Sequence, residues 1–260
     1  MSIPARLSRT SFAVLFSACS MLAVAQPATK SAFEPQVGQE GKDVVWVPTP
    51  QALVDKMLDM AKLTKNDFLM DLGSGDGRTV ITAAKRGARA TGIEYNPDMV
   101  ELSRRNAEKA GVSSRATFMK ADLFETDLSK ATVITMFLLP EINLRLRPKI
   151  LDLKPGTRVV ANTFTMGDWH ADETQTVEDG CTSWCTALLW IVPAKVAGTH
   201  KLPGGGEVTL KQQFQMLSGF VHADGKSTAL EGKVRGADVQ FRAGGKTYHA
   251  RANGKTLDFK

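Results

Sequence analysis

A glycine-rich segment at residues 71–78 constrains the fold of this chain more than any other feature. It reads Asp-Leu-Gly-Ser-Gly-Asp-Gly-Arg and begins at the end of an apolar, strand-like run at residues 68–72. Alternate glycines let the backbone turn sharply and approach a ligand closely, and the following helix offers its unpaired N-terminal amides. A dinucleotide-binding loop needs its third glycine three positions after the second, where this chain has Arg78. The segment therefore predicts a strand, a ligand-binding turn and a helix, and its spacing argues against NAD.

Short apolar runs alternate with amphipathic stretches on both sides of this segment. Strands are predicted at residues 68–72, 90–94, 116–119, 131–137 and 158–163. Helices are predicted at residues 53–61, after a Thr49-Pro50 cap, and at residues 78–86, 97–110 and 141–151. Strands that alternate with helices form a parallel sheet with right-handed crossovers and helices on both faces. The predicted fold class is α/β, a doubly wound Rossmann-like sheet whose ligand lies at the carboxyl ends of the strands.

Two acidic residues occupy places where such a sheet contacts a ligand. Glu94 ends the second predicted strand, where a carboxylate accepts hydrogen bonds from a ribose diol. Asp122 follows the third strand and can accept a bond from an exocyclic amine such as that of adenine. Either acid alone is typical of a solvated loop. Together with the glycine segment, and in this chain order, they indicate a nucleoside ligand.

On these motifs, residues 43–192 resemble the class I, seven-β-strand S-adenosylmethionine-dependent methyltransferases. The resemblance implies that Glu94 holds the ribose of S-adenosyl-L-methionine and that Asp122 with Leu123 contacts the adenine. The residues implied to bind its methionine end are Asp71, Gly73, Gly75 and Gly77. It also implies a seven-stranded sheet, and methyl transfer of this kind needs no metal.

Several segments are similar to a bacterial branch related to the non-SET lysine methyltransferases of chromatin and mitochondria. They are the glycine segment and residues 47–50, 137–140 and 153–160. Enzymes that methylate adenine, cytosine N4 or glutamine place Asn or Asp before Pro-Pro-aromatic after strand four, but residues 136–140 here read Met-Phe-Leu-Leu-Pro. Base methylation is therefore disfavoured. The acceptor stays unidentified, with a protein lysine amine as the one that this similarity implies.

Methyl transfer from a sulfonium is an in-line displacement that demands alignment and exclusion of water. A lysine acceptor must be neutral, and an apolar wall at residues 137–139 would favour the neutral amine by desolvation. Asp168, Trp169 and His170 follow the fifth strand, so we expect them to face the same crevice as catalytic residues. Asp168 or His170 would accept or orient a proton. The alternative is a surface turn around a half-buried Trp169.

The N-terminus has the composition of a secretory signal peptide. Arg6 and Arg9 precede an apolar run at residues 11–24 that ends in Ala-Val-Ala, so cleavage is expected before Gln26. The run is shorter than the roughly 20 residues that span a bilayer. We therefore expect residues 1–25 to be removed and the mature protein to be periplasmic or extracellular.

Two cysteines remain after this cleavage, Cys181 and Cys185. Export to an oxidising compartment makes a disulfide possible, provided that the segment is a turn, because cysteines four apart on a helix are poorly placed. Zinc is not expected with two thiols and His170 as the nearest histidine. The pairing stays open at this point.

The composition changes near Pro193. Residues 26–193 carry 20 basic and 22 acidic side chains, whereas residues 194–260 carry 11 basic and 5 acidic ones. Period-two runs predict strands at residues 207–214, 228–234, 237–241, 246–250 and 256–259, with hairpin turns at Gly244-Gly245 and Asn253-Gly254. We predict a methyltransferase domain at 26–193 and a small antiparallel β extension at 194–260. The basic charge of the extension would suit contact with an acidic envelope surface.

The sequence thus predicts an exported, monomeric S-adenosylmethionine-dependent methyltransferase acting on a protein or small molecule. Nucleic acid is not expected as a partner, because the protein is exported and its basic tail lacks interleaved aromatic residues. Two alternatives stay open. One is a non-catalytic S-adenosylmethionine- or nucleoside-binding envelope protein. The other is an aminopropyl transferase similar to spermidine synthase, although no acidic pair is placed for a polyamine.

Overall fold

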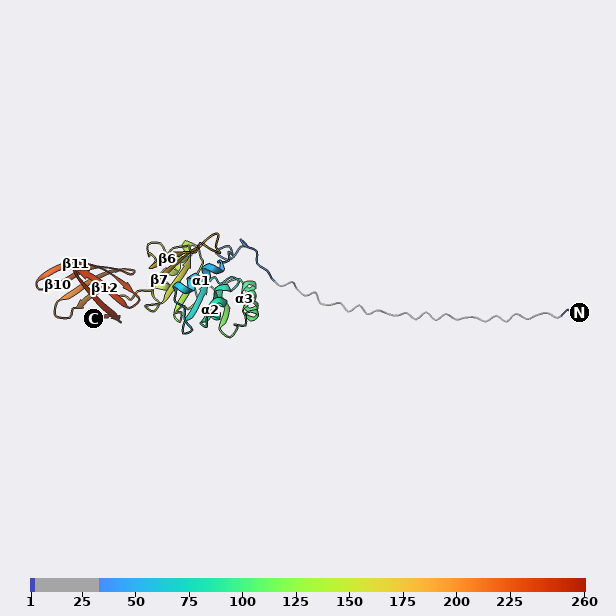
Figure 1. Ribbon diagram of the computed structural model, residues 1–260, viewed down its shortest axis with the longest axis horizontal. Helices are drawn as coiled ribbons and strands as arrows, with labels where there is room; N and C mark the ends of the chain where they lie inside the picture. The colour runs from blue at the N-terminus through green and yellow to red at the C-terminus, as the bar shows by residue number, and fades with distance from the viewer. Residues whose placement is uncertain (3–32) are drawn as a thin grey trace. The chain divides into compact units, whose positions relative to one another are not determined.

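The computed structural model describes residues 1–2 and 33–260, so the predicted signal peptide and its cleavage site lie outside the described residues apart from the first two. Residues 33–260 form one compact unit. The unit contains two seven-stranded sheets, which Figure 1 colours in chain order. Within the part of the chain that the structure describes, every helix is too short or too polar to cross a membrane.

The first five strands of the first sheet are parallel, as predicted. They are β1 (Phe68–Leu72), β2 (Arg89–Glu94), β3 (Ala116–Lys120), β4 (Val133–Met136) and β5 (Arg158–Asn162), in the spatial order β3-β2-β1-β4-β5. The helices are α1 (Gln51–Met60), α2 (Arg78–Lys85), α3 (Pro97–Lys109) and α4 (Pro140–Leu151). All nine elements were predicted, with small shifts at their ends.

A hairpin completes the sheet beyond β5. β7 (Thr186–Ile191) pairs antiparallel with β5 on one side and with β6 (Glu173–Thr176) on the other. The seven-stranded sheet implied by the resemblance is confirmed, and β7 runs antiparallel to both of its neighbours. The reason is the short connection from β6 to β7, because parallel neighbours need a long crossover and a hairpin does not.

Alternation along the strands gives the sheet two apolar cores. Leu69 of β1 packs in one core with residues of α1, α2 and α3, and its neighbour Met70 packs in the other with residues of α4. Successive strand residues point to opposite faces, so one strand supplies both cores. Helices on the two faces leave the loops at the carboxyl ends of the parallel strands free to form a site.

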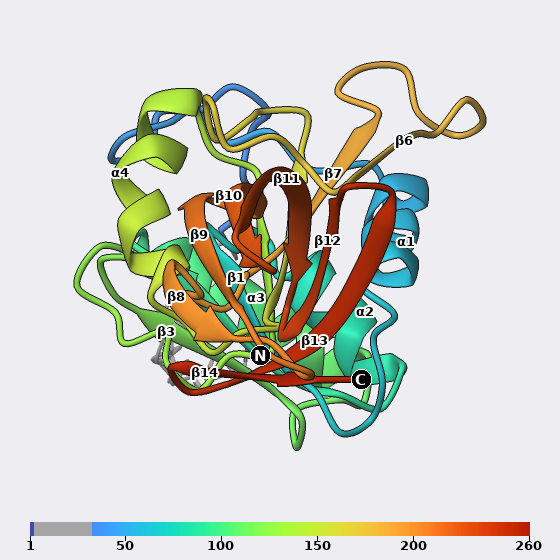
Figure 2. The same ribbon diagram turned by 90° about the vertical axis from the view of Figure 1, so that its left-hand side faces the viewer.

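The second sheet is an antiparallel meander with its own core (Figure 2). Its strands are β8 (Gly198–Lys201), β9 (Glu207–Gln213), β10 (Met216–Ala223), β11 (Lys226–Arg235), β12 (Asp238–Ala243), β13 (Lys246–Asn253) and β14 (Thr256–Phe259). The predicted turns at Gly244-Gly245 and Asn253-Gly254 join β12 to β13 and β13 to β14. β8 and β10 were not predicted. β10 contains Gly219, where a Cβ would lie 1.9 Å from the Thr209 carbonyl oxygen. The glycine lets the two backbones approach closely, but it interrupts the alternation of apolar and polar side chains by which a strand is predicted.

The two sheets contact each other beside β5 and β7. The Trp169 and Phe214 rings stack with centroids 6.0 Å apart. Lys233 Nζ lies 2.8 Å from Oδ1 of Asp172, whose side chain has no exposed surface. The loop after β5 is therefore the surface on which the C-terminal sheet rests. The first sheet ends at Ile191 and the second begins at Gly198, on either side of Pro193, while the division into domains stays a prediction.

Candidate active site

A cavity of about 420 Å³ lies at the carboxyl ends of the parallel strands. Its wall includes Asp71, Gly73, Gly75, Glu94, Asp122 and Leu123. These residues come from the ends of β1, β2 and β3, which are neighbours in the sheet. The volume falls in the range of about 300 to 1,000 Å³ typical of small-molecule sites. Sheet order thus brings three separately predicted motifs to one cavity.

Glu94 also fixes the shape of the glycine loop. Its Oε2 accepts a hydrogen bond from the Gly75 amide at 3.0 Å, and its Oε1 accepts one from the Asn96 amide at 2.9 Å. Gly73 and Gly75 have φ of 76° and 53°, a conformation that favours glycine. An ionised carboxylate has acceptor sites for further bonds. Glu94 can therefore hold the loop and still accept bonds from a ribose diol.

Asp71 is buried beneath the loop at 6% exposure. Burial raises the pKa of Asp71 to about 7, helped by the nearby charges of Asp76 and Glu94 and opposed by the bond from Thr135. That bond joins Thr135 Oγ1 to Asp71 Oδ1 at 2.7 Å. A buried carboxylate of this kind gains from a cationic ligand group beside it. The α-ammonium of a methionine moiety is such a group.

Asp122 lines the cavity just beyond the end of β3. Its Oδ1 accepts a bond from the Phe124 amide at 2.8 Å, and its Oδ2 lies 2.6 Å from Lys42 Nζ. The hydrogen bond from Lys42, followed by that of Phe124, lowers the pKa of Asp122. Asp122 is thus an ionised acceptor, as the predicted contact with an adenine amine requires.

Gly77 differs from the other predicted cofactor residues, because it does not line the cavity. It precedes α2 at φ 83°, and a Cβ there would lie 2.8 Å from the Phe118 ring and 2.9 Å from Ser103 Cβ. The missing side chain lets α2 pack closely against β3 and α3. Gly77 thus serves close packing, and its predicted contact with the cofactor stays a prediction.

Asp168, Trp169 and His170 do not reach the cavity either. Trp169 is fully buried between Trp190 and Phe214, while Asp168 and His170 are exposed. Asp168 is paired with Arg147 of α4. The expectation that these residues face the cofactor crevice is therefore wrong. After β5 the chain turns toward the C-terminal sheet, which buries the indole that sequence alone could only place on a loop.

Residues before α1 form a wall of the cavity that no sequence pattern indicated. The amide of Gly38 donates to the Trp46 carbonyl and the amide of Trp46 to the Gln39 carbonyl, both at 2.9 Å. A Cβ on Gly75 would lie 2.6 Å from Trp46 Nε1, so the indole packs directly on the glycine loop. The segment at residues 39–49 lines the cavity throughout. Trp46, just ahead of the first helix, was the one sequence signal that could have indicated this wall.

Thr49 has a different role from the predicted helix cap. Pro50 holds the cap position of α1 without a side-chain bond. The Thr49 carbonyl accepts a bond from Arg78 at 2.9 Å, and its hydroxyl accepts one from Asn162 Nδ2 at 3.3 Å. Thr49 thus ties the N-terminal wall to the glycine loop and to the end of β5. Asn162 is fully buried at the end of β5. A polar residue at the end of an apolar strand is the sequence signal that could have indicated its place at the site.

Aromatic residues surround the side of the cavity beyond β4. The Phe137 ring lies 5.9 Å from that of Phe164 and 6.0 Å from that of Trp184, measured between centroids. All three line the cavity together with Leu138 and Leu139, so the predicted apolar wall is confirmed. Trp184 belongs to the loop between β6 and β7, which nothing in the sequence had connected with the site.

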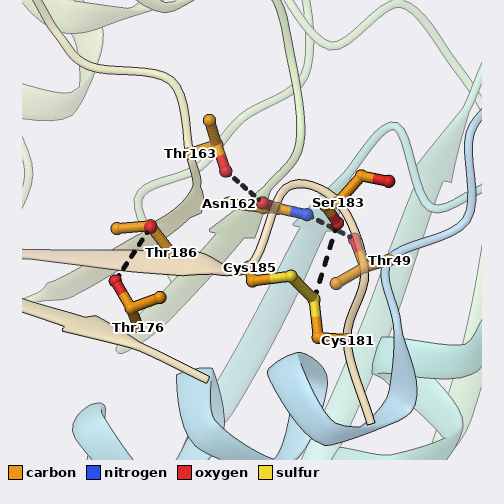
Figure 3. The surroundings of a disulfide bond; sticks show 8 residues. All are labelled: Thr49, Asn162, Thr163, Thr176, Cys181, Ser183, Cys185 and Thr186. Carbon is orange, nitrogen blue, oxygen red and sulfur yellow. Dashed lines mark hydrogen bonds between the residues drawn. A yellow bond between two sulfur atoms is a disulfide. The ribbon is translucent and has the colours of Figure 1, made fainter. Parts of the chain in front are cut away.

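Cys181 and Cys185 form a disulfide across this loop. Figure 3 draws it with the hydrogen-bonded pair Thr49 and Asn162. The segment is a turn and not a helix, which was the condition set for pairing.

The charged residues of the wall favour a cationic ligand. The acids are Glu40, Asp43, Asp71, Asp76, Glu94 and Asp122, against the bases Lys42 and Arg78. Both bases are paired with acids of the same wall, Lys42 with Asp122 and Arg78 with Asp76. S-adenosylmethionine carries a sulfonium and an ammonium, so the excess of acids suits it. The buried Ser74 Oγ has no hydrogen-bond partner among the described residues, which leaves a polar contact for a ligand.

A sheet of order β3-β2-β1-β4-β5-β7-β6 with this loop and these acids defines a class I S-adenosylmethionine-dependent methyltransferase. Residues 71–173 match the family described as the ANTKMT methyltransferase domain. The chain is 44% identical over 161 residues to a protein-lysine N-methyltransferase of Saccharolobus islandicus, a match that covers 61% of this chain and 96% of that protein. The chain belongs to the family of this enzyme.

Two further comparisons agree on the class. The adenine nucleotide translocase lysine N-methyltransferase of Mus musculus is 38% identical over 104 residues, which cover 39% of this chain and 45% of that protein. The chain thus spans less than half the length of this relative. A crystal structure described as an RNA methyltransferase from Salinibacter ruber, in complex with S-adenosyl-L-homocysteine, has 47% identity and a TM-score of 0.54. It is matched over 58% of this chain and 96% of its own.

Proposed function

We propose that the chain transfers the methyl group of S-adenosylmethionine to the ε-amine of a lysine in a protein. One observation carries the proposal. The cofactor residues lie at the ends of β1, β2 and β3, while the adjoining wall after β4 is apolar and formed by Phe137, Leu138 and Leu139. An electrophile on the polar side and a desolvated amine on the apolar side are the two requirements of lysine methylation.

Each part of the chain has a separate task in this reaction. The bound cofactor supplies an electrophilic methyl group. Asp71 and Glu94 bind and orient the cofactor, and Trp46 covers the glycine loop against water. The wall at residues 137–139 disfavours the charged ammonium, so the acceptor amine gives up its proton to water before it attacks. Alignment and water exclusion then account for catalysis without a dedicated base.

The excess of acids around the cavity supports a cationic acceptor as well as a cationic cofactor. Glu178 and Asp179, which precede the disulfide loop in the chain, are both exposed and add negative charge there. The relatives described as lysine methyltransferases add support from the comparisons. RNA is the competing acceptor, because the similar Salinibacter structure is described as an RNA methyltransferase. A polyanion would meet an acidic rim, which is why we favour protein.

The test uses purified protein with tritium-labelled S-adenosylmethionine and, in separate reactions, the protein fraction and the total RNA of host cells. We expect label in protein, recovered as methyllysine after acid hydrolysis. Glu94→Ala should abolish most of it, while Glu108→Ala, on the exposed side of α3, should not. Label in RNA alone would overturn the proposal. Cofactor binding without label in either fraction would favour the non-catalytic binding protein.

We also propose that the protein is exported. The charged and apolar order of residues 6–25 and the disulfide of Cys181 with Cys185 support this. A fusion of residues 1–30 to a reporter active only outside the cytoplasm should give signal, and the mature N-terminus should be Gln26. An intact Met1 in the cytoplasmic fraction would contradict export. Contact of the basic C-terminal sheet with an acidic envelope surface stays a prediction.

A further inference from the structure

Trp184 is an exposed aromatic residue of the cavity wall that is not among the predicted cofactor contacts. Its side chain is 45% exposed, although it also lines the cavity. The cofactor contacts lie at β1, β2 and β3, and Trp184 lies across the sheet, in the loop that leads into β7 beside β5. It therefore stands on the acceptor side of the cavity.

The backbone at Trp184 is held in an uncommon conformation. Its φ is 51°, in the left-handed region that residues other than glycine, Asn and Asp seldom adopt. Such a residue keeps this conformation only where its surroundings impose it. Here Cys181 and Cys185 close the loop around it, and Cys185 directly precedes β7, whose Thr186 carbonyl accepts a bond from the Thr163 amide at 2.7 Å. The disulfide thus closes a short loop that carries Trp184 directly before a strand of the sheet.

Phe137 lies beside Trp184, and Phe164 stacks on Phe137. Phe137 follows β4, and Phe164 follows β5. The fully buried Asn143 of α4 donates to the carbonyls of Phe164 and Thr165, both at 3.2 Å. Phe137 and Phe164 thus follow two parallel strands, whereas Trp184 lies inside the loop that the disulfide closes.

We propose that Trp184, held by the Cys181–Cys185 disulfide, completes with Phe137 and Phe164 an aromatic channel that admits the acceptor lysine side chain. This inference rests on the proposed function. The aromatic faces pack against the long alkyl stem, and the exposed face of Trp184 attracts the ammonium before it reaches the apolar wall at residues 137–139 and loses its proton. Asp179, two residues before Cys181, is exposed and adds a negative charge to this loop. The disulfide then sets affinity for the acceptor and not for the cofactor.

The test measures the acceptor KM and the cofactor Kd separately. The acceptor is the host protein fraction, titrated by total protein concentration, and label in methyllysine is the readout. Trp184→Ala should raise the KM about tenfold or leave saturation out of reach, because a desolvated aromatic contact is lost. The cofactor Kd, from isothermal titration, should change less than about twofold. Trp184→Phe should restore part of the activity.

Reduction provides a second arm of the same test. Treatment with a phosphine reductant should reproduce the KM increase in the wild type, and the Cys181→Ser, Cys185→Ser double variant should show it without reductant and not respond further. Phe220→Ala is the matched control, because Phe220 is 46% exposed and lies on β10 of the second sheet. It should behave as the wild type.

The outcomes separate this inference from the proposed function. If the wild type labels lysine but neither Trp184→Ala nor reduction changes the acceptor KM, the aromatic channel is wrong and the proposed function stands. If Trp184→Ala weakens cofactor binding as much as methylation, Trp184 belongs to the cofactor site and the channel is also wrong. If the wild type labels no lysine at all, both fail together.

Discussion

Lys42 Nζ lies 2.6 Å from Asp122 Oδ2, so a residue of the N-terminal wall occupies the acid that is expected to bind the adenine amine. The same lysine lies 4.5 Å from the centroid of the Tyr95 ring. Lys42 and the adenine amine would both donate to one carboxylate, whose Oδ1 already accepts the Phe124 amide. Cofactor binding must therefore displace or share this ion pair.

Replacement of Lys42 by Gln should tighten cofactor binding, because Asp122 loses its competing charged donor. The pair is partly exposed, so we expect a gain of only about two- to fivefold in Kd by isothermal titration. Lys120→Gln is the matched control, since it removes the same charge from the end of β3 outside the cavity wall. Weaker binding by Lys42→Gln would mean that the lysine closes over the bound cofactor.

Replacement of Gly75 by Ala should impair the cofactor site through sterics. A Cβ would lie 2.6 Å from Trp46 Nε1 and push the N-terminal wall away from the loop. We expect cofactor affinity to fall by about tenfold or more, since alignment of several contacts is lost. Gly111→Ala shares the positive φ but has open space around its Cβ, so it should lose stability without losing affinity. Equal affinity in the two variants would show that Trp46 does not shape the site.

The sequence was most informative where a motif and the sheet topology coincide. Asp71, Glu94 and Asp122 lie at the ends of consecutive strands, so a parallel sheet necessarily brings them together at one edge. Trp46 and Trp184 lie outside this regularity. They reach the cavity from a segment without regular structure and from a disulfide loop, whose positions depend on long-range contacts that no periodicity encodes.

The residues after β5 illustrate the opposite error. Asp168 and Trp169 were expected at the ligand because ligands of such sheets bind at the carboxyl ends of the strands, and both residues follow the carboxyl end of β5. The C-terminal sheet supplies Phe214, which stacks on Trp169 and draws this loop out of the crevice. The position of Trp169 therefore depends on its contact with Phe214, which is distant in the sequence. A pattern within either segment alone could not reveal this contact.

Replacement of Asp168 by Ala should therefore leave methylation unchanged. The carboxylate is exposed and paired with Arg147, and it does not line the cavity. We expect kcat, acceptor KM and cofactor Kd within about twofold of the wild type, as for an exposed ion pair. A large loss of kcat with unchanged cofactor affinity would restore the catalytic role predicted from the sequence.

Asp71 should make stability depend on pH. Its pKa is about 7 in the folded protein, against an unperturbed value of 3.8. The folded state therefore holds a proton that the unfolded state has lost, so stability falls as pH rises through this interval and levels off above it. Asp71→Asn should lack this decline, and its advantage in melting temperature over the wild type should grow from about pH 4 to about pH 7.

The same Asp71→Asn variant should bind the cofactor more weakly, because the amide offers no charge to the ammonium group. Glu108→Gln is the control for both measurements, since Glu108 is exposed on α3. An Asp71→Asn protein that melts in parallel with the wild type at every pH would contradict the raised pKa.

Lys233→Met should weaken the contact between the two sheets. Asp172 has no exposed side-chain surface, and its Oδ2 accepts a bond from the Ile191 amide at 2.9 Å while Lys233 Nζ lies 2.8 Å from Oδ1. Removing the lysine charge leaves a buried carboxylate with one hydrogen bond, which costs about 1 to 3 kcal/mol of unfolding free energy. Urea titration followed by tryptophan fluorescence should show the loss as a lower midpoint, because Trp169 lies at this interface. Lys226→Met, an exposed lysine on the same strand, should keep the wild-type midpoint. Equal midpoints for the two variants would mean that the Asp172 charge is satisfied without Lys233.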